Sequence, residues 1–147
     1  MGMSFAVGVA IATKKQKLDC HIYVIVGDGE CNEGLIWESA MSASHYKLSN
    51  MTVIVDCNKL QYDGETTQVM DMLSLSEKFK SFGFNTTETD GHDVEKLLNA
   101  ISNKSSEGPN AIIAHTVKGK GVSYMENIKE WHHSKLSLSQ YEQADGV

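Results

Sequence analysis

The amino-acid sequence predicts an α/β fold, with an open, mainly parallel sheet that carries helices on both faces. Continuous β-branched runs at residues 20–27 and 51–56 are typical of strands covered on both faces. Segments with helical spacing of apolar residues alternate with such runs in the order α-β-α-β-α-β-α-β. A chain of 147 residues, 41% hydrophobic and 22% charged, suits one folded domain with its own core.

The first half of the chain contains two helices and the first strand. Residues 3–13 are small and apolar around most of the helix circumference, which predicts packing against neighbours on several sides. Residues 20–27 predict a buried strand that ends in a tight turn at Gly-Asp-Gly. Residues 33–46 predict a second helix, with Asn32 as its N-cap.

The second half continues the alternation after the strand at residues 51–56. Residues 58–72 are polar and predict a long irregular loop just past that strand. Further helices are expected at residues 73–82 and 94–104, and further strands at 84–88 and 110–116. We therefore predict a domain at residues 1–121, followed by a tail at 122–147 that contains Trp131, His132 and a short polar helix.

Composition excludes several classes of function. A formal net charge of −6 argues against a nucleic-acid partner. The longest apolar runs, such as residues 22–26, fall far short of the roughly 20 residues that cross a bilayer, so no membrane partner is expected. Three cysteines without a Cys-x-x-Cys pair argue against a disulfide framework and favour a reducing, cytoplasmic setting.

Asp28 and Asn58 are the most informative pair in the sequence. Each follows a predicted strand, and 30 positions separate them, which is room for one strand-helix-strand unit. Because parallel strands end at the same edge of a sheet, both side chains are expected to converge there. Carboxylate and amide oxygens suit Mg²⁺, which prefers few protein ligands together with phosphate oxygens and water. The pair therefore predicts a metal-bridged diphosphate site.

This pattern resembles the diphosphate-binding signature of thiamine diphosphate enzymes, which is Gly-Asp-Gly, then 28 residues, then Asn. The surrounding sequence is similar to transketolase in particular. Five stretches resemble that family in the correct order: GMSFAVG (2–8), GDGECNEG (27–34), DCNKL (56–60), DGHD (90–93) and TVKGKG (116–121). They span nearly the whole chain, so the resemblance implies the diphosphate-binding domain of the thiamine diphosphate fold.

The resemblance implies a cofactor and its ligands. Asp28 and Asn58 would bind Mg²⁺ or Ca²⁺ by their side chains, and Leu60 by its backbone carbonyl. Gly27 and Gly29 would lie against the diphosphate of thiamine diphosphate. The alternatives are ordinary: Asp28 as a turn residue, Asn58 as a cap of the following loop, and Leu60 as a core residue.

Two further residues match family positions. Glu33 corresponds to a glutamate that takes part in subunit contacts and links paired active sites. His132 resembles a histidine that approaches the diphosphate and substrate, although the family usually has glycine where this chain has His133. Glu33 could instead complement the dipole of its helix, and His132 could be an exposed tail residue.

The implied function is transfer of a two-carbon ketol unit between sugar phosphates, as one part of a larger enzyme. The chain resembles a family member that lacks an upstream segment, and no residue matches the glutamate that contacts the aminopyrimidine. We therefore expect a partner, either a pyrimidine-domain subunit or a C-terminal half, in a homo- or hetero-oligomer. The apolar helix at residues 3–13 also favours oligomerisation. The alternatives are a non-catalytic interaction module of the same fold and a related enzyme such as 1-deoxyxylulose-5-phosphate synthase.

Overall fold

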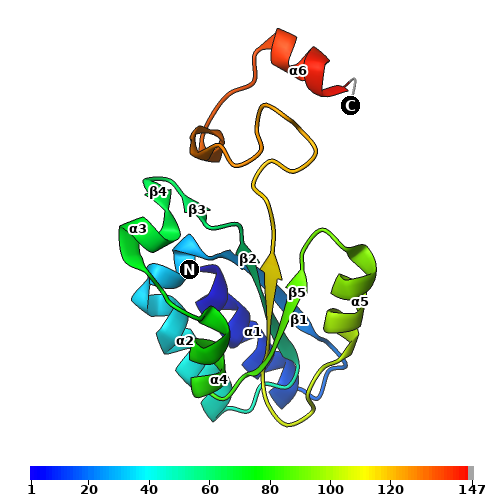
Figure 1. Ribbon diagram of the computed structural model, residues 1–147. Coiled ribbons are helices and arrows are strands. Elements are labelled where there is room, and N and C mark those ends of the chain that lie inside the picture. The colour runs from blue at the N-terminus through cyan, green and yellow to red at the C-terminus, as the bar shows by residue number, and fades with distance from the viewer. Residues whose placement is uncertain (146–147) are drawn as a thin grey trace.

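A four-stranded parallel sheet forms the centre of the molecule. The computed structural model describes residues 1–145. Its main strands are β1 (Ile22–Gly27), β2 (Met51–Cys57), β5 (Asn85–Asp90) and β6 (Asn110–His115). They pair in the order β1-β2-β6-β5, and every pairing is parallel (Figure 1). The predicted fold class is confirmed.

Helices cover both faces of this sheet, but unequally. Helices α1 (Gly2–Lys15), α2 (Gly34–His45) and α4 (Leu75–Ser81) lie on one side, and α5 (Val94–Ser102) lies on the other (Figure 1). The main core fills the space between the sheet and the first three helices, because alternate residues of β2 and β6 point there. Buried members of this core include Val53, Val55, Phe79, Ala111 and Ile113.

Part of the apolar surface is left uncovered. Helix α1 buries a single stripe that includes Met3 and Ala10, while Phe5 is 76% exposed. The prediction that this helix packs on several sides is therefore wrong for this chain by itself. On the opposite face, α5 packs against β5 and β6, and Ile25 of β1 is 71% exposed.

Two local predictions are also corrected. Asn32 does not cap the second helix: it ends a 3-10 turn, η1 (Gly29–Asn32), and α2 begins after Glu33. The amide of Asn32 is used elsewhere, since it donates to Gln61. The helix expected at 73–82 begins only after Ser74, whose hydroxyl accepts the Glu77 N–H and caps α4.

The segment expected to be irregular contains short elements. Residues 58–72 form a small hairpin of β3 (Leu60–Gln61) and β4 (Gly64–Glu65), followed by α3 (Thr66–Met70). After β6 the tail extends past the sheet edge (Figure 1) and contains η2 (Lys129–His132) and α6 (Leu138–Asp145). The last two residues of the predicted tail, 146–147, lie outside the described residues.

The register places all four strand ends at one edge. Gly27 pairs with Asp56, and His115 pairs with both Cys57 and Asp90. The chain segments that follow β1, β2 and β6 therefore emerge close together, where ligands bind in open parallel sheets. Among residues 1–145, no helix has both the length and the apolar character that spanning a bilayer requires.

Candidate functional site

A pocket of about 540 Å³ lies at the carboxyl edge of the sheet. It is formed by the ends of β1 and β2, the hairpin, the segment after β6 and the η2 turn. All seven residues that the sequence singled out line this one pocket: Gly27, Asp28, Gly29, Glu33, Asn58, Leu60 and His132. The tertiary structure therefore brings together residues that are up to about a hundred positions apart.

Asp28 lines the pocket and is 4% exposed. Its Oδ1 accepts the Gly29 N–H at 2.9 Å, and its Oδ2 accepts the Lys59 N–H at 2.7 Å. Burial raises the pKa of the carboxyl group and nearby Asp56 adds to this, while the two N–H groups oppose the rise. Each oxygen keeps a free lone pair, so a bound cation would offset the unfavourable burial of the charge.

Asn58 is held in one orientation by its neighbours. Its Nδ2 donates to Oδ2 of Asp56 at 3.1 Å, and its Oδ1 accepts the Leu60 N–H at 3.0 Å. The other carboxylate oxygen of Asp56 accepts the Thr116 hydroxyl. Asp56 thus fixes which end of the amide is the acceptor, and that oxygen has a lone pair left for a cation.

The Gly-Asp-Gly turn packs tightly against the hairpin. A Cβ placed on Gly29 would lie 2.8 Å from the Cβ of Gln61, closer than real atoms approach. The Gly27 N–H donates to the carboxylate of Glu30 at 2.7 Å. Glycine at position 29 therefore lets the turn and the hairpin form one wall of the pocket.

His132 and Glu33 line the outer part of the pocket, and both are exposed. The His132 ring lies edge-on to the ring of Tyr62, with a centroid distance of 6.1 Å. This contact places the η2 turn of the tail beside the hairpin. His133, the neighbour that departs from the family pattern, does not line the pocket.

Sequence reasoning missed Lys118 as a site residue. Lys118 is half-buried and lines the pocket with Glu30, Gln61 and Tyr62. Its ammonium group can donate a charge-assisted hydrogen bond to a phosphate oxygen, whereas the acidic residues of the pocket would repel phosphate. The available signal was its place in TVKGKG, two residues after the predicted last strand and so at the same sheet edge.

The donor set favours a hard cation with few protein ligands. Carboxylates of Asp28, Glu30, Glu33 and Asp56 line the pocket. Within residues 1–145, no three His, Cys, Asp or Glu side chains are grouped so that they could hold a metal ion. A metal here would therefore also need the amide, a backbone carbonyl, water or phosphate oxygens, as Mg²⁺ usually does.

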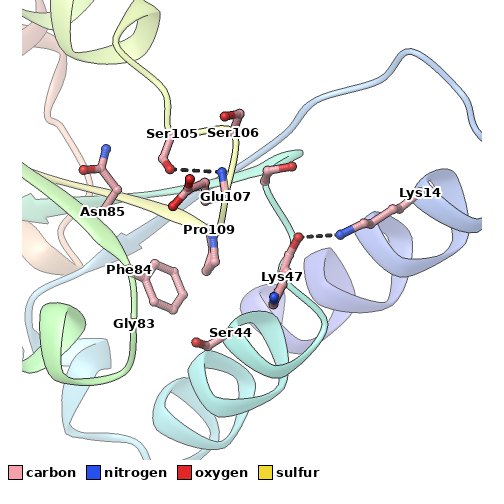
Figure 2. A pocket seen from close by; sticks show the side chains of 12 residues that line it. Lys14, Ser44, Lys47, Gly83, Phe84, Asn85, Ser105, Ser106, Glu107 and Pro109 are labelled. Carbon is pink, nitrogen blue, oxygen red and sulfur yellow. Dashed lines mark hydrogen bonds between the residues drawn. The ribbon is translucent and has the colours of Figure 1, made fainter.

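A wider hollow of about 950 Å³ lies at the opposite, amino-terminal edge of the sheet (Figure 2). Its lining includes Lys14, whose ammonium donates to the carbonyls of Tyr46 and Lys47. None of the predicted site residues lines it. Ligands of parallel sheets bind at the other edge, so this hollow is not the candidate site.

Two of the three cysteines are protected by their surroundings. Cys31 is fully buried, and burial, with smaller effects from Asp28 and Glu30, raises its pKa to about 12. Burial raises the pKa of Cys57 to about 11, while Cys20 is exposed.

Because the thiolate is the reactive form, alkylation of the native chain at neutral pH should label Cys20 only, as read by mass spectrometry. Denatured chain, as a control, should gain label at all three cysteines, and native labelling of Cys31 would contradict the prediction.

Comparison with known proteins agrees with this geometry. The family model "Transketolase, thiamine diphosphate binding domain" matches residues 1–145. An apulose-4-phosphate transketolase subunit from Phocaeicola vulgatus is 42% identical over 145 residues, covering 97% of this chain and 52% of that protein. Human transketolase is 35% identical over 143 residues, which cover 97% of this chain and 23% of the human protein.

Solved structures give the same result. Transketolase from Campylobacter jejuni superposes with a TM-score of 0.92 at 30% identity, covering 99% of this chain and 24% of that chain. The chain thus spans about half the length of the Phocaeicola vulgatus relative and about a quarter of full-length transketolases. Sequence, fold and the arrangement of the pocket agree, and the chain belongs to the transketolase family, in which it is the thiamine diphosphate-binding domain.

Proposed function

We propose that this chain holds the diphosphate of thiamine diphosphate through a divalent cation, Mg²⁺ or Ca²⁺, as one part of a transketolase-type enzyme. The observation that carries the proposal is the single pocket that collects Asp28, Asn58 and Leu60 from the ends of two adjacent strands. Asp28 supplies a buried carboxylate, Asn58 an oriented amide oxygen, and Leu60 a backbone carbonyl. Such a sparse oxygen set suits a cation that is also bound by diphosphate.

The rest of the pocket fits the cofactor. Gly27 and Gly29 bring backbone close to the diphosphate, and the Lys118 ammonium balances its charge. When bound, thiamine diphosphate supplies the carbanion chemistry that transfers a two-carbon ketol unit between sugar phosphates. His132 lies at the outer part of the pocket, where its ring nitrogen can hold or transfer a proton at a substrate oxygen.

A partner completes the proposed enzyme. The Phocaeicola vulgatus relative is named as one subunit of a transketolase, which supports a second polypeptide carrying the pyrimidine domain. The exposed Phe5 and Ile25 offer apolar surface for such contacts. The exposure of Glu33 beside the pocket supports the proposal that it takes part in subunit contacts. We expect the chain alone to lack ketol transfer. The three free cysteines support a cytoplasmic setting. A non-catalytic module is less well supported, because the named relatives are transketolases.

Calorimetric titration with thiamine diphosphate tests the proposal without any assay of activity. In the presence of Mg²⁺ we expect saturable binding, weak for the chain alone because the pyrimidine half of the site is contributed by the partner. Removal of metal by EDTA should abolish the heat signal, and Ca²⁺ should restore it. Equal binding with and without metal would refute a cation-bridged diphosphate.

A further inference from the structure

The turn Asp90–Gly91–His92 is one of the motifs in the sequence, yet none of it lines the cofactor pocket. It follows β5 and lies against the segment that leaves β6. The Gly91 N–H donates to the carbonyl of His115 at 2.8 Å, and Nε2 of His92 accepts the N–H of Val117 at 2.7 Å. Both partners lie within three residues of Lys118.

Glycine is needed at the centre of this turn. A Cβ on residue 91 would collide with Cγ2 of Thr116 and would lie 3.1 Å from the carbonyl oxygen of His115. A side chain at this position would force the Thr116 side chain to move and the His115 carbonyl to shift, so the close approach depends on Gly91. The Asp90 carboxylate accepts the His92 N–H at 2.9 Å and closes the turn.

The same segment is held on its other side by residues at the end of β2. The Thr116 N–H donates to the carbonyl of Cys57 at 3.3 Å. The Thr116 hydroxyl donates to Asp56, which in turn accepts from the amide of Asn58. Hydrogen bonds therefore hold residues 115–117 between the end of β2 and the Asp90–Gly91–His92 turn. The residue that follows them, Lys118, lines the pocket.

We infer that the Asp90–Gly91–His92 turn positions the cofactor pocket, and that His92 is a positioning residue. By fixing residues 115–117, this turn sets the direction in which Lys118 enters the pocket. It also keeps the Thr116 hydroxyl hydrogen-bonded to Asp56. The inference rests on the proposed function only in naming what Lys118 binds. Because Nε2 of His92 accepts a hydrogen bond, the ring is the neutral form with its proton on Nδ1.

Two variants of the full chain separate the hydrogen bond from the side chain's bulk. His92→Leu removes the acceptor, whereas His92→Gln can offer a carbonyl oxygen in its place. His92 is exposed, so both variants should keep the melting temperature of the parent chain. In His92→Leu we expect hydrogen exchange of the Val117 amide and tryptic cleavage after Lys118 to rise about 2- to 10-fold, which is the range for loss of one hydrogen bond. In His92→Gln both rates should stay within about 2-fold of the parent.

A spectroscopic measurement on the unaltered chain gives an independent test. Nitrogen-15 NMR of the imidazole ring should find the proton of His92 on Nδ1. A proton on Nε2 would overturn the inference. So would parental rates of exchange and cleavage in His92→Leu, or rates in His92→Gln as high as those expected for His92→Leu. None of these measurements uses the cofactor, so they can fail or succeed separately from the titration with thiamine diphosphate.

Discussion

Replacing Asp28 by asparagine is expected to abolish Mg²⁺-dependent binding of thiamine diphosphate. The substitution keeps the size of the side chain but removes the only buried carboxylate that faces the pocket from the Gly-Asp-Gly turn. A loss of affinity of about 100-fold or more is expected, because even indirect support of a metal ligand is worth about 10- to 100-fold. Calorimetric titration in the presence of Mg²⁺ measures the effect.

Asp19→Asn is the matched control for this change, because Asp19 is an exposed carboxylate in the segment before β1. It makes the same change of charge and should leave the affinity unchanged. Circular dichroism should confirm that the Asp28→Asn chain is folded. If that folded variant bound thiamine diphosphate as the parent does, Asp28 would not be a metal ligand.

Replacing Phe79 by alanine is expected to lower the free energy of unfolding by about 3–5 kcal/mol. Phe79 is fully buried, and its ring centroid lies 5.1 Å from that of Trp37 and 5.3 Å from that of Phe84. Truncation would leave a cavity where α4 joins α2 to the sheet. A loss of this size is a large part of the about 5–15 kcal/mol typical of a domain.

Urea unfolding followed by tryptophan fluorescence measures this loss, since Trp37 reports on the same cluster. Phe5→Ala provides the control: Phe5 is 76% exposed, so its truncation should change the free energy of unfolding by no more than about 0.5 kcal/mol. A Phe79→Ala chain destabilised by less than about 1 kcal/mol would mean that the α4 contact is not part of the cooperative core.

Strands β1 and β2 were predictable because their residues form continuous runs rich in β-branched side chains. The β-branched run at residues 51–56 is typical of a strand covered on both faces, and β2 is such a strand, between β1 and β6. Residues 20–27 gave the same prediction of a buried strand, which is wrong for one face, because β1 is an edge strand whose Ile25 is 71% exposed. The caps were less predictable. Asn32 has the chemistry of an N-cap but donates across the chain to Gln61 instead, because a distant partner competed with the local one.

The residues of the candidate site also differ in how well the sequence could predict them. Asp28 and Asn58 could be found from the sequence because each follows a strand directly, and adjacent parallel strands bring such residues to one edge. The place of Lys118 in TVKGKG indicates the same edge, but its entry into the pocket depends on the path of the tail. Tyr62 could not be found from the sequence, since its place depends on the hairpin. The role inferred for His92 was likewise invisible, because its bond to Val117 joins two loops 25 positions apart.

The sequence by itself determined the class of fold, the four parallel strands and the residues expected to hold a metal and a diphosphate. These follow from side-chain type and short-range spacing, which act within one strand and the turn after it. The tertiary structure alone decided the strand order β1-β2-β6-β5, which apolar faces stay uncovered, and how Lys118 and His132 reach the pocket. Those features depend on contacts between segments far apart in the chain, where the free energy of packing, and not local propensity, selects the arrangement.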